Sequence, residues 1–70
     1  MAKREWIGNY KLHYVEYYSY KDEQVMREAN LGHCLGVDEA IVKAICFLDN
    51  QSGTVYPRYI SDGWGNKIKA

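Results

Sequence analysis

The sequence predicts a small α+β domain, in which one amphipathic helix packs on one face of an antiparallel sheet of three to four strands. Two observations support this fold class. Residues 37–49 place apolar side chains at helical spacing, and residues 10–18 and 54–60 are rich in the aromatic and β-branched residues that favour strands. Because the chain has 70 residues, we assign residues 1–70 to a single domain with the order β-β-α-β-β.

The first strand is predicted at residues 10–18, which contain neither Gly nor Pro. Because side chains alternate between the two faces of a strand, both faces carry aromatic rings. One face holds Tyr10, Leu12, Tyr14 and Tyr18, and the other holds His13, Val15 and Tyr17. The pair Gly8-Asn9 suits a tight hairpin, which predicts a short additional strand at Trp6 and Ile7.

Residues 22–36 are compatible with two structures. The spacing of Val25, Met26 and Ala29 suits a short helix. The alternate positions Val25, Arg27, Ala29 and Leu31 follow the pattern of a strand. A long first strand needs a pairing partner, and residues 20–23 suit a hairpin turn. We therefore predict a second strand, with β-α-α-β-β as the alternative order.

The helix at residues 37–49 has Asp38 and Glu39 in its first turn, where the helix dipole favours acidic groups. Its predicted core stripe consists of Val37, Ala40, Ile41, Ala44, Ile45 and Leu48. Val42 and Cys46 lie on the opposite face, where a fully solvated helix would be polar. This predicts that a partner or another segment of the chain covers that face.

A third strand is predicted at residues 54–60 and a last short strand at residues 67–69, with a turn between them. Pro57 lacks a backbone N–H and cannot donate to the sheet ladder. It therefore belongs at an edge or at a bulge.

The nine basic and nine acidic side chains cancel, which argues against a general electrostatic binder of nucleic acid. The charges are nevertheless unevenly distributed along the chain. Residues 16–49 hold seven acids and three bases. The two ends hold the bases Lys3, Arg4, Lys11, Arg58, Lys67 and Lys69. If the ends meet in one sheet, the molecule is a dipole with an acidic helix side and a basic edge.

No combination of residues in the sequence indicates a chemical reaction. His13, His33, Cys34 and Cys46 form no pair with the spacing of metal ligands, and the two cysteines are interpreted as reduced packing thiols. No nucleophile, base and stabilising group can be assembled from the sequence. We therefore expect a non-enzymatic protein without a metal or a cofactor.

No run of about 20 apolar residues is present, and residues 1–10 lack the apolar stretch of a signal peptide. The sequence therefore predicts no membrane partner and a location in the cytoplasm.

The phrase DEAIVKAICFLDNQ followed by VYPRYISDGWGNKI resembles small orphan proteins of phages and mobile elements, in which a hairpin, a helix and a closing hairpin form an independent module. The resemblance implies a protein that binds and modulates a host or defence protein. It also implies the cytoplasm of the host cell as its location.

The excess of tyrosine suggests how such a protein binds, because one helix can cover only one face of a small sheet and Tyr, Trp and Arg are enriched in binding hot spots. We expect a protein-binding module, monomeric or homodimeric, that acts by steric occlusion. The alternative is a nucleic-acid-binding protein that stacks bases on the sheet tyrosines and contacts phosphates through Lys11, Arg58, Lys67 and Lys69. The candidate contact residues are Tyr14, Tyr17, Tyr18, Tyr56, Arg58, Tyr59, Trp64, Val42 and Cys46.

Overall fold

The computed structural model describes residues 5–69, and within them four strands and one helix follow the order β-β-α-β-β. The elements are β1 (Gly8–Tyr18), β2 (Glu23–Cys34), α1 (Val37–Asp49), β3 (Thr54–Ser61) and β4 (Lys67–Lys69). The predicted α+β class and element order are confirmed. The ambiguous segment 22–36 forms a strand because it pairs with β1 along nearly its whole length.

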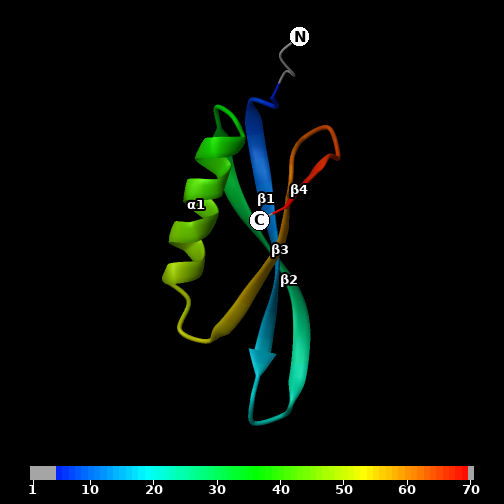
Figure 1. The fold of residues 1–70 in the computed structure, drawn as a ribbon, viewed down its shortest axis with the longest axis vertical. Coiled ribbons are helices and arrows are strands. Elements are labelled where there is room, and N and C mark those ends of the chain that lie inside the picture. Colours follow the sequence, from blue (N-terminus) through cyan, green and yellow to red (C-terminus); the bar gives the residue numbers. More distant parts are fainter. Residues whose placement is uncertain (1–4, 70) are drawn as a thin grey trace.

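The strands form one antiparallel sheet in the order β2-β1-β3-β4, so β1 has a partner on each side. Figure 1 shows α1 running beside one half of the sheet, while the turn between β1 and β2 extends past the end of the helix. The molecule is accordingly elongated, with extents of 48 × 20 × 16 Å. One helix leaves much of this sheet uncovered.

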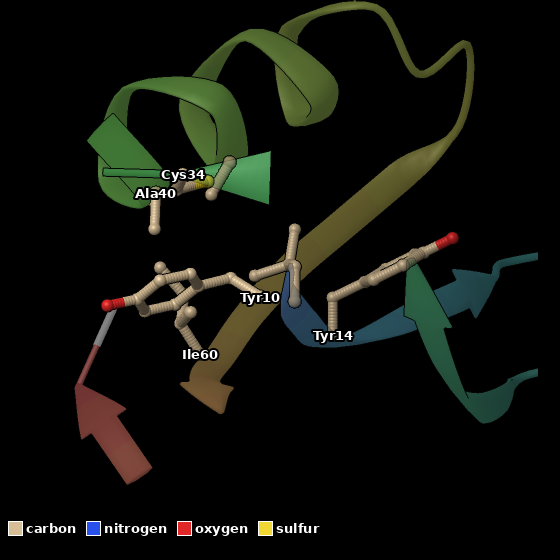
Figure 2. Packing of buried hydrophobic residues seen from close by; sticks show 7 residues of the cluster. Tyr10, Tyr14, Cys34, Ala40 and Ile60 are labelled. Carbon is tan, nitrogen blue, oxygen red and sulfur yellow. The ribbon is translucent and has the colours of Figure 1, made fainter. Parts of the chain in front are cut away.

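The core lies between α1 and the sheet. Its buried members are Tyr10, Leu12, Tyr14, Cys34, Ala40, Ala44 and Ile60. Figure 2 shows the ring of Tyr10 between Ala40 of the helix and Ile60 of β3. Tyr10 is fully buried, and its hydroxyl donates a 2.6 Å hydrogen bond to the carbonyl oxygen of Trp6, so its polar end has a partner.

The helix begins and ends where the sequence predicts, but one member of its expected core stripe is wrong. Ile45 is 54% exposed. It lies about a third of a turn around the helix from the line through Ala40 and Ala44, the two buried residues of α1. Phe47 packs on the core instead, with its ring 5.4 Å from the ring of Tyr14.

The predicted strand at Trp6 and Ile7 is also wrong, since β1 begins at Gly8 and residues 5–7 have no ladder partner. The indole N–H of Trp6 donates to the carbonyl oxygen of Asn9 at 3.0 Å, and its ring lies 5.3 Å from that of Trp64. The segment is therefore held by side-chain contacts and does not extend the sheet.

Pro57 occupies the position that its chemistry requires. The pairing of β1 with β3 shifts between His13 and Tyr14, where Tyr59 and then Pro57 are the partners, so Arg58 is an extra residue. β4 pairs only with residues 59–61 of β3, which leaves Pro57 at the edge of the sheet. Both predicted settings, edge and bulge, are confirmed. Lys3 and Arg4 lie outside the described residues.

Candidate binding face of the sheet

The face of the sheet that points away from the core gathers the basic and aromatic residues of three strands. We call it the open face and define it by its charged and aromatic side chains. These are Lys11, His13, Tyr17, Glu28, Tyr56, Arg58, Tyr59, Lys67 and Lys69.

Strand alternation and register place these side chains together. Leu12 and Tyr14 are buried against the helix, so Lys11 and His13 project to the other side. Directly opposite residues share a face. Across the ladders, Tyr59 therefore joins His13, and Tyr56 joins Val15. β4 adds Lys69 opposite Tyr59 and Lys67 opposite Ser61.

The aromatic rings of the open face are held in defined positions. The rings of His13 and Tyr59 are stacked, with centroids 4.4 Å apart and planes 19° apart. The ammonium of Lys67 lies 5.0 Å from the centre of the Tyr59 ring, which is cation-π geometry. Tyr56 is 56% exposed, so its ring is accessible to a ligand.

The hydroxyl of Tyr17 donates a 2.7 Å hydrogen bond to Asp22 in the turn between β1 and β2. This bond raises the pKa of Tyr17, because it stabilises the protonated phenol beside a carboxylate. It also fixes the direction of the ring at one end of the open face.

A cavity of about 270 Å³ lies beside the stacked rings. Met26, Glu28 and Arg58 contribute to its walls together with His13 and Tyr59. Arg58, the extra residue of the bulge, reaches across β1, and its Nη1 lies 3.6 Å from the sulfur of Met26. A cationic group therefore borders a hollow lined by aromatic rings.

The charges of the open face are predominantly positive. Four basic residues, Lys11, Arg58, Lys67 and Lys69, lie on this face. Among the strand residues that the structure describes, Glu28 is the acidic residue on the same face. The acids Asp38, Glu39 and Asp49 belong to α1 on the other side of the sheet. The charge separation expected from the sequence thus runs from face to face.

The nine sequence-predicted contact residues do not form one surface. The open face brings together Tyr17, Tyr56, Arg58 and Tyr59. Trp64 lies at the end of the molecule beside Trp6, and Val42 and Cys46 are exposed on α1. Tyr14 is corrected, because it is only 7% exposed and packs against Phe47. Its burial removes it from the candidate contact residues.

Tyr18 belongs to a polar cluster on the helix side of the sheet, beyond the end of α1. Its hydroxyl donates to Glu16 at 2.8 Å and accepts a hydrogen bond from Arg27 at 2.8 Å. The hydrogen bond from Tyr18 and the neighbouring guanidinium of Arg27 hold the pKa of Glu16 below its usual range. The Tyr18 hydroxyl is therefore engaged within the molecule.

One group of polar residues was missed by sequence reasoning. His13 Nε2 lies 3.0 Å from Ser61 Oγ, and His13 Nδ1 lies 3.5 Å from Glu28 Oε2. Ser61 is 48 residues away from His13 in the chain, so no local motif joins them. Only the pairing of β1 with both β2 and β3 places the three side chains side by side.

No protein-family model, curated protein or solved structure matches this chain. The resemblance to phage and mobile-element proteins therefore stays a prediction. Within residues 5–69, no group of three or more His, Cys, Asp or Glu side chains is placed to hold a metal ion. None of the helical segments in the described range has the length and apolar character needed to cross a bilayer. Cys34 is buried, Cys46 is exposed, and both are free thiols.

Proposed function

We propose that this protein binds single-stranded nucleic acid on the open face of its sheet. The observation that carries the proposal is that four basic side chains lie on the same face as the rings of Tyr17, Tyr56 and Tyr59. The sequence alone favoured a protein partner. The distribution of charge between the two faces reverses that preference.

The chemistry of single strands fits both components of the face. Unpaired bases expose flat surfaces that stack on aromatic side chains, and each stacked base contributes about 1–3 kcal/mol. Tyr56 offers an accessible ring for such stacking. Lysine and arginine contact the phosphates, and the counterions that they displace make the binding dependent on salt. A duplex hides the faces of its bases, so it gains only the contacts of its phosphates with lysine and arginine.

The zero net charge of the chain does not oppose this proposal, because the approach of a polyanion depends on the local potential. The acids of α1 repel nucleic acid from the helix side, while Lys11, Lys67 and Lys69 attract it to the open face. The separation of charge therefore favours binding with the open face, and not the helix, toward the nucleic acid.

The test is a titration of fluorescent single-stranded DNA and RNA oligonucleotides at several salt concentrations. If three or four phosphates are neutralised, affinity should fall about 20- to 50-fold between about 50 and 200 mM salt. Tyr56→Ala should weaken binding about tenfold through loss of one stacked base. Lys69→Gln should weaken binding and reduce the slope of log affinity against log salt by about 0.7.

Matched controls come from the turn between β1 and β2, which does not contain any of the four basic residues of the open face. Tyr20 is 77% exposed, so Tyr20→Ala removes an accessible ring that the proposal does not use. Lys21→Gln removes an equivalent charge in the same turn. Both variants should bind like the wild type. Equal losses in the Tyr56 and Tyr20 variants, or equal affinity for duplex and single strand, would contradict the proposal.

A second candidate function is protein binding by steric occlusion at the end of the molecule near Trp6. Its supporting observation is a hollow of about 460 Å³ bordered by Ile7, Leu35 and Trp64, whose exposed fractions are 61%, 68% and 54%. Clustered exposed apolar side chains are typical of interaction surfaces. If the titration finds no binding to any oligonucleotide, a protein partner at this end becomes the better proposal.

A further inference from the structure

The contacts of His13 form a polar relay across three strands of the open face. Ser61 on β3 lies at one ring nitrogen of His13 and Glu28 on β2 at the other, at 3.0 Å and 3.5 Å. The His13 side chain is 20% exposed and the Glu28 side chain 60% exposed. A hydroxyl, an imidazole and a carboxylate in this order have the connectivity of a serine nucleophile with its base and its orienting group.

The surroundings of His13 favour one assignment of its protons. A carboxylate accepts hydrogen bonds, so Glu28 favours the tautomer with the proton on Nδ1. Nε2 then has a free lone pair that accepts the hydrogen of the Ser61 hydroxyl. The stacked ring of Tyr59, 4.4 Å away, fixes the plane of the imidazole so that both contacts are made together.

Ser61 also lines a second hollow, of about 410 Å³, which is distinct from the cavity beside Arg58. Lys11 and Asn30 line the same hollow, and Lys11 is the direct ladder partner of both Ser61 and Asn30. The Asn30 side-chain oxygen accepts a 2.9 Å hydrogen bond from the Gly32 N–H. Its NH₂ group is not engaged by that bond, and Lys11 lines the same hollow.

We propose that Ser61 is the nucleophile of an acyl-transfer site that hydrolyses small carboxylic esters. His13 is its general base, Glu28 is a positioning residue, and Lys11 and Asn30 stabilise negative charge on the substrate carbonyl oxygen. The hollow at Ser61 has the volume expected for a small-molecule site.

The reaction needs only ester and water. Ser61 Oγ bonds to the acyl carbon as its proton passes to His13 Nε2, and the carbonyl oxygen becomes an oxyanion. The bond between the acyl carbon and the alcohol oxygen breaks, and the alcohol leaves with the proton from His13. Water then attacks the acyl-serine with His13 again as base, which releases the carboxylic acid and restores Ser61.

The test combines a covalent probe with a chromogenic ester. A fluorophosphonate should label the folded protein at Ser61, identified by mass spectrometry, because attack of activated Oγ on phosphorus expels fluoride. The same preparation should hydrolyse p-nitrophenyl acetate. Ser61→Ala should abolish the label at that position, and His13→Gln should slow labelling and hydrolysis about 100-fold or more.

Glu28→Gln separates a positioning role from a purely structural one. It keeps the size of the side chain but removes the charge, so kcat should fall at least tenfold with little change in KM. The matched serine control is Ser52→Ala, which changes an exposed serine in the loop between α1 and β3 and should leave both activities unchanged.

Two results would overturn the proposal: no labelling of Ser61 in protein shown to be folded by circular dichroism, or equal labelling of Ser61 in native and urea-unfolded protein. Because oligonucleotide binding is measured separately, failure of the ester assay leaves the proposed nucleic-acid binding intact, and the reverse also holds.

Discussion

At the scale of single residues, the start of α1 depends on two carboxylates. Gly36, the residue before the helix, offers no side-chain cap, and the Val37 N–H instead donates to Glu5 at 2.8 Å. Glu39 reaches back to accept the Leu35 N–H at 3.0 Å, and Lys43 lies 3.4 Å from its other oxygen. The backbone hydrogen bond from Leu35, supported by Lys43, holds the pKa of Glu39 below its usual range.

This lowered pKa predicts a specific loss of stability in acid. A carboxyl group with a lower pKa in the folded state stabilises the fold above its unfolded pKa, and this contribution disappears as pH falls through the folded value. Because the ordinary value is 4.5, the loss should occur below about pH 4.5. In urea titrations, the stability difference between wild type and Glu39→Gln should shrink between about pH 6 and pH 3. A difference that stays constant over this range would show that the Glu39 charge makes no such contribution.

Residue-scale reasoning from the sequence assigned the two faces of β1 correctly, because alternation is a local rule. It did not identify Ile45 as exposed. The apolar residues of α1 fit a core stripe on either side of Ala44, and only the packing of the helix on the sheet determines which side is buried. It also missed His13, Glu28 and Ser61 as a group. Their proximity depends on which residues pair across the two ladders of β1, and although Pro57 indicates an edge or a bulge, it does not give that register.

At the scale of elements, β2 shows how a long strand tolerates an irregularity. Tyr10 pairs with Gly32 and Lys11 pairs with Asn30, so Leu31 is an extra residue in β2. Gly32 has a φ of 78°, a conformation that residues with a Cβ adopt only at a cost. The bulge therefore requires glycine for its backbone conformation.

Gly32→Ala should destabilise the protein by about 1 kcal/mol, measured as a shift of the urea midpoint without a change in slope. A Cβ at this position would meet nothing within 4 Å, so the effect isolates the backbone conformation. Gly53→Ala is the matched control. A Cβ there would meet Glu16 at an ordinary 3.5 Å without a left-handed φ, so its effect should be near zero. Equal effects of the two substitutions would contradict this account of the bulge.

The elements differed in how far the sequence predicted them. The helix was predicted to the residue because its periodicity is local. Local propensity slightly favoured a helix for the second strand, which was predicted because the first strand needed a partner and residues 20–23 suited a hairpin turn. The expected strand at Trp6 and Ile7 rested on a turn signature alone, and the Trp6 indole instead bonds to the backbone at Asn9.

At the scale of the whole molecule, the shape is unusual for a chain of this length. The Cα radius of gyration is 13.1 Å, whereas a compact chain of 70 residues would have about 11 Å. The difference arises because the turn between β1 and β2 extends beyond the helix (Figure 1). The sequence predicted the elements but gave no measure of this extension.

Small-angle X-ray scattering should therefore give a radius of gyration of about 13 to 14 Å, at concentrations where forward scattering matches a mass of 8.2 kDa. The distance distribution should have the long tail of a rod-like particle. A value near 11 Å at that mass would mean that the β1-β2 hairpin folds back over the sheet. Such closure would cover the rings proposed to contact nucleic acid.

The extra residue at Arg58 has a consequence for how this protein can change. Tyr56 and Tyr59 are separated by an odd number of positions, so in an uninterrupted strand they would point to opposite faces. The shift in pairing between His13 and Tyr14 restores them to the same one. The surface therefore depends on the spacing and pairing of these residues along β3 as well as on their identity. If the pairing of β3 with β1 became regular while Tyr56 and Tyr59 kept their present spacing, the two tyrosines would point to opposite faces, although every residue type that the surface uses would still be present.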